Sequence, residues 1–290
     1  MLLRDQIQMR DPFVFVEDGK YYLYGTTDAN CWRGQPAGFD AYVSNDLVHF
    51  EHGGRIFAPS DSFWGTENYW APEMHKYKGE YYLFASFKAP GRHRATSILK
   101  ADNPLGPFLP WGEDAATPTE WECLDGTLYV DAAGKPHIIF CHEWVQEGGG
   151  TIYSRPLKDD LSGPLGEAHT LFAAKDARWT KQITHSSGIS GHVTDGPYLY
   201  KPQNGQLWML WSSISDTGYA IGLAISKSGS IQGPWHQAEE PVYAGDGGHG
   251  MIFRALDGKL YLTIHTPNRT PDERPIFLQV IETESGLILA

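Results

Sequence analysis

Five short segments of the sequence each begin with one residue placed directly before an apolar, strand-like run. Three of these leading residues are aspartates, and in chain order the five are Asp11, Ala71, Asp125, Asp195 and His249. A single Asp at such a place usually caps a turn. Three at one position of a repeat are different, because Asn, Ser or Gly would make the turn equally well. We therefore interpret the set as functional.

Carboxyl groups gathered into one small space suit glycoside hydrolysis. One carboxylate stays ionised to activate a water molecule, and another stays protonated to give its proton to the leaving oxygen. Nearby like charges raise the pKa of the least solvated carboxyl, and a third acid adjusts that pKa while orienting its neighbour. The pattern therefore predicts that Asp11, Asp125 and Asp195 are catalytic residues.

Aromatic and polar side chains near these segments are candidates for contacts with substrate. Trp and Tyr offer flat apolar surfaces to sugar rings, although each Trp taken alone could equally pack in the core. A polar stretch at residues 185–192 can also carry binding groups. The predicted substrate-binding residues are Trp32, Trp70, Trp144, Glu143 and His192.

The elements that must position these residues form a repeat. Each leading residue is followed by an apolar segment, a Gly-containing turn and a second apolar segment, as in residues 198–211. The copies start about 54 to 70 residues apart, which suits one propeller blade with its loops. Further strands are expected in residues 41–44, 96–99, 151–154, 222–226 and 276–280.

We predict an all-β fold, a five-bladed β-propeller with four-stranded antiparallel blades that occupies residues 1–290 as a single domain. One blade cannot bury both of its faces, so a five-fold repeat favours one ring. The 32 Gly and 19 Pro residues suit a fold of tight turns. The first strand of each propeller blade lines the central channel, so the five leading residues are expected to converge there.

Further expectations concern the ends and loops of the blades. Residues 1–10 are too few for a blade, and they either add an edge strand to the last blade, closing the ring, or form a loose tail. Residues 28–40 are expected to overhang one face of the disc. Turn-rich segments at 103–108, 161–164 and 230–235 are expected at outer blade edges.

Composition argues against several partners. The formal charge is −12 and the basic residues are dispersed, so nucleic acid is not expected to bind. No run approaches the roughly 18 apolar residues of a membrane span, and no signal peptide is visible, so the cytoplasm is expected unless a leader has been removed. Cys31, Cys123 and Cys141 are expected to be reduced and buried. A monomer or weak homo-oligomer is expected.

The order and phasing of five motifs resemble glycoside hydrolase family 43, the five-bladed arabinanases, arabinofuranosidases and β-xylosidases. The motifs are Arg10-Asp11-Pro12, Trp70-Ala71-Pro72-Glu73, Leu124-Asp125-Gly126, Asp195-Gly196-Pro197 and Gly248-His249-Gly250. The resemblance implies an inverting mechanism in which Asp11 matches the general base, Asp195 the general acid and Asp125 the modulator of the acid's pKa. It also implies that His249 holds a central calcium ion, largely through waters.

The sequence departs from this family at the acid, which is usually Glu where this chain has Asp195. Asp is one methylene shorter. Inverting enzymes accept carboxyl separations of about 6.5–9.5 Å, which leaves room for the shorter side chain. Glu143 or Glu122 is the alternative proton donor.

The resemblance predicts a hydrolase of pentose-containing glycans, either α-L-arabinofuranosides or β-D-xylosides, with small imported oligosaccharides as substrates. Two alternatives stay open. Residues 121–125 resemble the acid motif of the retaining invertase and fructanase propellers, although the Asp-rich N-terminal signature of those enzymes is matched only at Asp11-Pro12. The second alternative is a non-catalytic sugar-binding propeller that has kept the fold but lost the general acid. Asp195 in place of the usual Glu would then be a mark of that loss. A protein-interaction propeller is disfavoured because its Gly-His and Trp-Asp signatures are absent.

Overall fold

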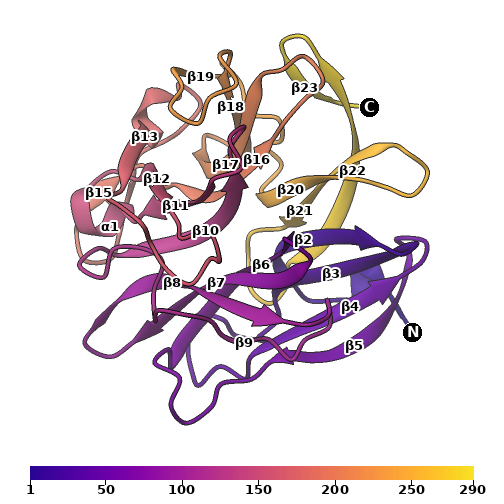
Figure 1. The fold of residues 1–290 in the computed structure, drawn as a ribbon. Helices are drawn as coiled ribbons and strands as arrows, with labels where there is room; N and C mark the ends of the chain where they lie inside the picture. Colours follow the sequence, from indigo (N-terminus) through magenta and orange to yellow (C-terminus); the bar gives the residue numbers. More distant parts are fainter.

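The chain forms a ring of antiparallel four-stranded blades, as the sequence predicts (Figure 1). This computed structural model describes residues 1–146 and 148–290 in full and residue 147 by its backbone. Within that part, five blades follow one another along the chain, and their inner strands surround a common centre. The five-bladed β-propeller is confirmed.

Each blade is one contiguous stretch of sequence, so its strands pair in chain order. Blade one contains β2 (Arg10–Glu17), β3 (Lys20–Thr26), β4 (Phe39–Ser44) and β5 (His49–Phe57). Blade two contains β6 (Glu67–Tyr77), β7 (Glu80–Ala89), β8 (Arg92–Ala101) and β9 (Leu109–Pro110). Blade three contains β10 (Cys123–Val130), β11 (Pro136–His142), β12 (Thr151–Pro156) and β13 (His169–Ala173). Blade four contains β16 (Asp195–Tyr200), β17 (Leu207–Ser215), β18 (Gly218–Ser226) and β19 (Trp235–Gln237). Blade five contains β20 (Gly248–Arg254), β21 (Leu260–Thr266), β22 (Arg274–Thr283) and β23 (Gly286–Leu289).

Small elements connect or extend the blades. They are β1 (Leu2–Leu3), η1 (Arg4–Gln6), α1 (Trp144–Glu147), η2 (Ala174–Asp176) and the two-stranded sheet of β14 (Ile183–Thr184) with β15 (Ser190–Gly191). The third strands expected from the sequence all lie within β4, β8, β12, β18 and β22. Among the described residues, none of the helices has the length and apolar character that crossing a bilayer requires.

The core lies between blades, and strand alternation builds it. In β17, Met209 and Trp211 pack against Phe172 of blade three, while Trp208 and Leu210 pack with the apolar residues of blade five. Successive side chains of a strand point to opposite faces, so a strand buried on both faces reads as a continuous apolar run. Cys31, Cys123 and Cys141 are free and buried, which confirms that prediction.

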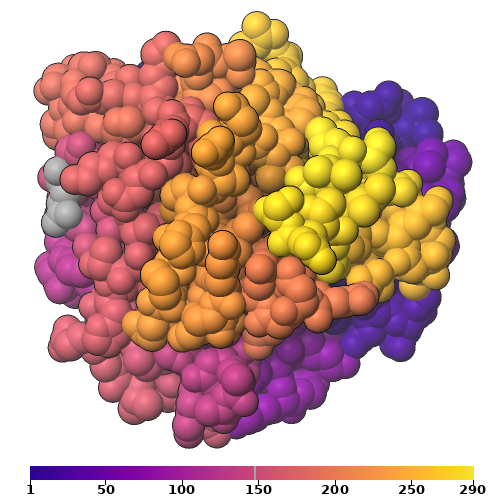
Figure 2. Space-filling view, turned by 90° about the horizontal axis from the view of Figure 1, so that it is seen from above, coloured from indigo at the N-terminus to yellow at the C-terminus, as the bar shows by residue number. Residues whose placement is uncertain are grey.

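The N-terminal residues form a different edge from the one expected. β1 pairs with β5, the outer strand of blade one, so it neither adds to the last blade nor forms a loose tail. The residues that follow do reach blade five, because the Met9 N–H donates to the Glu273 carbonyl at 3.3 Å and Arg274 Nε donates to the Asp5 carbonyl at 2.8 Å. Figure 2 shows indigo N-terminal residues beside the gold and yellow C-terminal ones.

Every inner strand carries a β-bulge near its start. The ladder to the second strand skips two residues there, and the first of the two has a positive φ. The bulge residues and their φ values are Asp11 (54°), Ala71 (48°), Asp125 (57°), Gly196 (51°) and His249 (46°). Left-handed backbone at a residue with a side chain costs about 1–3 kcal/mol and gathers at functional sites. Such bulges re-aim side chains, here toward the channel.

The bulges correct the alignment of blade four by one residue. The sequence alignment put Asp195 level with Asp11 and Asp125, but Gly196 holds that place. Blades three and four both contain an Asp-Gly pair, and aligning these pairs gave the wrong register. The proline that directly follows the bulge residue in three blades, namely Pro12, Pro72 and Pro197, gives the correct register. Asp195 therefore lies in the ladder, paired with Ser212.

A chain of hydrogen bonds links one bulge to the next blade around the ring. The N–H of four of the five bulge residues donates to a side chain on the second strand of the preceding blade. The four bonds are Ala71 to Thr26 Oγ1 (2.8 Å), Asp125 to Ser86 Oγ (2.8 Å), His249 to Ser212 Oγ (2.8 Å) and Asp11 to His265 Nδ1 (3.1 Å). The last bond joins blade five to blade one and closes the ring.

Blade three supplies the exception. Its second strand has Cys141 at the position that holds Thr, Ser or His in the other blades. A thiol is a weak acceptor. The Gly196 N–H donates instead to Asp125 Oδ2, at 3.0 Å. A carboxylate from one bulge thus holds the backbone of the next.

Removal of an acceptor from this chain should destabilise the whole ring. Ser86→Ala and Ser212→Ala each leave a buried N–H without a partner, and we expect a loss of about 1–3 kcal/mol in the free energy of unfolding. Urea denaturation measures it. The exposed Ser285→Ala is the matched control, expected within about 0.5 kcal/mol of the parent. Losses at Ser86 and Ser212 no larger than the control's would contradict this role.

Candidate active site

The five inner strands converge on a pocket of about 260 Å³. Asp11, Asp125, Asp195 and His249 all line it, so the structure brings together the three predicted catalytic aspartates and the predicted metal-binding histidine. Three of these residues stand on bulges, and Asp195 stands one position before the bulge of blade four. A group of acids in such a pocket is costly unless the site uses it.

Asp11 is the carboxyl that stays ionised. It is 8% exposed, and its Oδ2 accepts a 2.6 Å hydrogen bond from the Thr26 hydroxyl. Its Oδ1 lies 3.2 Å from His249 Nδ1. Burial alone would raise the pKa of Asp11, but His249 and Arg10, with the bond from Thr26, outweigh it and hold that pKa below its usual value. Asp11 can therefore accept a proton.

His265 orients Asp11 without carrying charge. Its Nδ1 accepts the Asp11 N–H, and its Nε2 lies 3.1 Å from Asn268 Oδ1, which can only accept, so the proton is on Nε2. Burial lowers the pKa of His265 to about 3. Its 3.6 Å approach to Asp11 Oδ1 is therefore no ion pair. Asn268 Oδ1 also accepts a bond from Arg10 Nη2 at 2.7 Å, which extends this network.

Asp125 and His249 share the middle of the pocket. Asp125 Oδ2 lies 3.6 Å from His249 Nδ1 and accepts the Gly196 N–H. Burial raises the pKa of Asp125 to about 7, because Asp195 and Asp11 add their repulsion and His249 only partly offsets it. Burial alone would lower the pKa of His249, but the three aspartates around it raise that pKa instead. The carboxyls around it thus favour the protonated form of the imidazole.

Asp195 is the second carboxyl that can hold a proton near neutral pH. Its Oδ2 accepts a 2.9 Å hydrogen bond from the Tyr219 hydroxyl, on the third strand of the same blade. Burial raises the pKa of Asp195 to about 6, against the lowering effect of His249 and of the Tyr219 bond. One low and one raised carboxyl pKa in the same pocket are the requirement for paired base and acid catalysis.

Glu143 also lines the pocket, whereas Glu122 does not. Burial raises the pKa of Glu143, and Arg94, whose Nε lies 3.8 Å from its Oε2, partly offsets this effect. Glu122 instead forms ion pairs with Lys88 and His93 at 3.0 and 3.1 Å. Burial alone would raise its pKa, but the Arg94 N–H and these partners lower it. Glu122 is therefore not positioned as a proton donor, and Glu143 is.

All three predicted aromatic contacts line the pocket, whereas the predicted polar contact His192 does not. Trp32, Trp70 and Trp144 are all part of its wall. Trp32 belongs to the 28–40 loop, which overhangs the channel as expected, and packs edge-on against Trp70 at 5.1 Å between ring centres. His192 lies outside the lining, and its Nδ1 is 2.8 Å from Thr180 Oγ1.

Several residues of the site were not predicted from the sequence. Thr26, Tyr219 and His265 each make a hydrogen bond to one of the aspartates. Arg94 is 5% exposed and lies over the Trp70 ring, 3.6 Å from its centre. Thr26 and His265 had a usable signal, because each lies opposite the residue before a bulge. Tyr219 and Arg94 had none, because only tertiary packing brings them to the pocket.

The calcium prediction has one supporting observation. Nε2 of His249 is buried and has no hydrogen-bond partner among the described residues, so the neutral ring could serve as a ligand. Among the described residues, however, no cluster of three or more His, Cys, Asp or Glu side chains is arranged to hold a metal. Calcium prefers six to eight oxygen ligands, so an ion here would be held mainly by water.

Replacing Tyr219 should change the titration of Asp195. Tyr219→Phe removes a hydrogen bond to the ionised carboxylate, so we expect the pKa of Asp195 to rise from about 6 by roughly one pH unit. Carboxyl ¹³C NMR of Asp-labelled protein measures it, and Asp195→Asn assigns the signal. A pKa that is unchanged or lower in Tyr219→Phe would show that the bond does not act on the acid.

Comparisons with known proteins agree with this geometry. The family model described as "Glycosyl hydrolases family 43" matches residues 6–287. A solved structure titled as an endo-arabinase from Bacteroides thetaiotaomicron VPI-5482 superposes with a TM-score of 0.92 at 39% identity, over 99% of both chains. An extracellular exo-α-(1→5)-L-arabinofuranosidase of Cellvibrio japonicus is 24% identical over 90% of this chain and 79% of its own. An α-L-arabinofuranosidase of Humicola insolens is 22% identical over 87% of this chain, which spans 53% of that relative. The chain belongs to glycosyl hydrolase family 43.

Proposed function

We propose that this glycoside hydrolase cleaves pentose-containing glycans with inversion, and that arabinofuranosides are its substrates. The observation that carries the proposal is that two carboxyl groups in one pocket have pKa values shifted in opposite directions. The pKa of Asp11 is lowered and that of Asp195 is raised. The relatives named above act on arabinofuranosyl linkages, which supports the choice of sugar.

Asp11 acts as the general base. Its carboxylate takes a proton from a water molecule, whose oxygen attacks the anomeric carbon. Two hydrogen bonds fix the orientation of Asp11. The Thr26 hydroxyl donates to its carboxylate, and its backbone N–H donates to His265. Arg10 and His249 keep it ionised, so it is ready over most of the pH range. A positioned base of this kind typically contributes about 10²–10⁴ in rate.

Asp195 acts as the general acid. As the glycosidic bond breaks, it gives its proton to the leaving oxygen, and its own carboxylate is then stabilised by the Tyr219 hydroxyl. Asp125 modulates it in two ways. The charge of Asp195 helps to raise the pKa of Asp125, so the two carboxyls interact, and Asp125 Oδ2 holds the N–H of Gly196, the next residue after the acid.

Asp195 lines the pocket although its side chain is one methylene shorter than Glu, and it does not occupy the bulge. It lies in the ladder opposite Ser212, one residue before the bulge residue Gly196. The retaining interpretation would need Glu122 as the acid, and its ion pairs with Lys88 and His93 occupy that carboxylate. The inverting assignment therefore uses the groups that line the pocket.

Two further expectations stay predictions. His249 Nε2 would be the protein ligand of a calcium ion, whose positive charge would favour the ionised carboxyls around it. The cytoplasmic location stays a prediction, and two relatives are named as extracellular enzymes.

The roles of acid and base can be separated by the leaving group. We expect Asp195→Asn to lower kcat by about 10²–10⁴ on arabinobiose, whose leaving oxygen needs a proton, and far less on a dinitrophenyl arabinofuranoside. Asp11→Asn should lower kcat on both substrates. For a general acid with a pKa of about 6, kcat/KM on arabinobiose falls as the pH rises through 6, because only the protonated form donates.

Glu143→Gln is the matched control, because Glu143 lines the same pocket and its pKa is also raised. It should not show the dependence on leaving group. If Glu143→Gln shows that dependence and Asp195→Asn does not, the acid is Glu143 and the assignment is wrong.

A further inference from the structure

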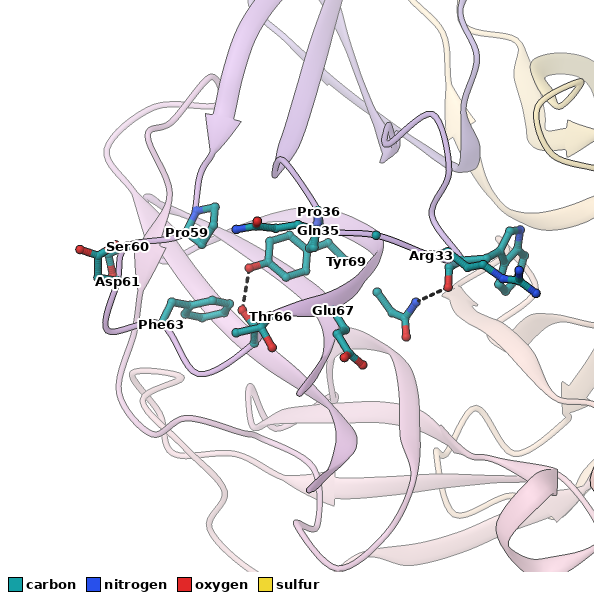
Figure 3. A pocket seen from close by; sticks show the side chains of 14 residues that line it. Arg33, Gln35, Pro36, Pro59, Ser60, Asp61, Phe63, Thr66, Glu67 and Tyr69 are labelled. Carbon is teal, nitrogen blue, oxygen red and sulfur yellow. Dashed lines mark hydrogen bonds between the residues drawn. The ribbon is translucent and has the colours of Figure 1, made fainter. Parts of the chain in front are cut away.

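A second, larger cavity adjoins the catalytic pocket on the side of blades one and two. Its volume is about 740 Å³, within the range of about 300–1,000 Å³ typical of small-molecule sites. It is lined by the 32–36 segment of the overhanging loop, by residues 59–61, 63, 65 and 66, and by the start of β6. Figure 3 shows Gln35 and Pro36 facing Phe63 and Thr66 in this view, with Tyr69 between them. We call it the loop cavity.

The loop cavity adjoins the catalytic pocket, and the two spaces share one side chain in their walls. Trp32 lines both spaces, and Asn68 of the cavity is two residues before Trp70 of the pocket. β6 holds this wall in place, because Asn68 Nδ2 donates to the carbonyls of Cys31 and Trp32, and Trp70 Nε1 donates to that of Cys31 at 2.7 Å. The Trp32 indole N–H donates to Thr270 Oγ1 at 2.9 Å, and the Arg10 guanidinium lies over the ring, 4.9 Å from its centre, so both contacts orient the ring.

The polar lining of the loop cavity is free to bind. In the part of the chain that the structure describes, the side chains of Arg33, Gln35 and Glu67 make no hydrogen bond or ion pair. They comprise a cationic donor, an amide and a carboxylate, which together match the mixed donors and acceptors of sugar hydroxyls. Trp32, 48% exposed, offers a flat face of the kind on which sugar rings stack.

The sizes of the two spaces suggest how an oligosaccharide would be shared between them. The catalytic pocket, at about 260 Å³, is small and suits one sugar ring, so the rest of an oligosaccharide must lie outside it. We propose that the loop cavity binds this remainder, the segment of a pentose oligosaccharide beyond the sugar held at the carboxyls. The inference rests on the proposed function and adds a preference for longer chains to it.

The test compares a one-sugar substrate with a five-sugar one. The double variant Gln35→Ala/Glu67→Gln and a matched control in blade five, Gln279→Ala/Glu284→Gln, are assayed on nitrophenyl α-L-arabinofuranoside and on 1,5-linked arabinopentaose. We expect the ratio of kcat/KM for the pentasaccharide to that for the aryl glycoside to fall about tenfold in the cavity variant. The ratio should keep its parent value in the control.

Calorimetry separates this proposal from the function on which it rests. Arabinopentaose is titrated into Asp195→Asn protein, with and without the cavity substitutions, so that ligand is not consumed. A Kd about tenfold weaker with the cavity substitutions supports the site even if the parent protein hydrolyses neither substrate, a result that would refute only the proposed function. An unchanged Kd, no binding, or equal loss on both substrates overturns the loop cavity as a binding site.

Discussion

The structure depends on the hydrogen bonds that four of the five bulge N–H groups make to the second strand of the blade before them. Four such bonds use Thr26, Ser86, Ser212 and His265, and the last joins blade five to blade one. A bulge residue with positive φ is strained, and such strain persists only where its surroundings over-determine it. These buried bonds supply that constraint. They fix the direction of the side chain that each bulge residue carries, so the bonds that close the ring also aim the catalytic groups.

The departures from five-fold symmetry coincide with the chemistry. Where blade three has Cys141 instead of a hydroxyl, the Gly196 N–H turns to Asp125, and the modulating carboxyl becomes bonded to the backbone beside the acid. Where blade five has His265, a neutral imidazole accepts the backbone N–H of Asp11. It therefore adds no charge beside the Asp11 carboxylate. Blade two has Ala71 at its bulge and therefore adds no carboxyl group from that position. The proposed acid and base thus differ in their surroundings because their repeats differ at single positions.

Much of the fold and of the site could be predicted from the sequence, because the five copies of the repeat can be aligned with one another. The five blades, their third strands and the convergence of Asp11, Asp125 and His249 follow from the spacing of similar segments. The register of Asp195 was missed by one residue, because the Asp-Gly pair that it shares with blade three outweighed the proline that follows the bulge. Tyr219 and Arg94 could not be found, since their sequence neighbours resemble any buried strand and only packing between strands brings them to the pocket. The pairing of β1 with its own blade likewise depended on a tertiary choice between two exposed edges.

The account assigns the attacking water to Asp11 and the leaving oxygen to Asp195, on two different blades, so that one displacement occurs at the anomeric carbon. The stereochemistry of the first product tests this most directly. In ¹H NMR spectra taken during the first minutes of arabino-oligosaccharide hydrolysis, before mutarotation, the account predicts that the newly formed reducing sugar appears as the β-anomer, inverted from the α-linkage. Initial appearance of the α-anomer would mean two displacements through a covalent intermediate, and would contradict the assignment of Asp11 as a base.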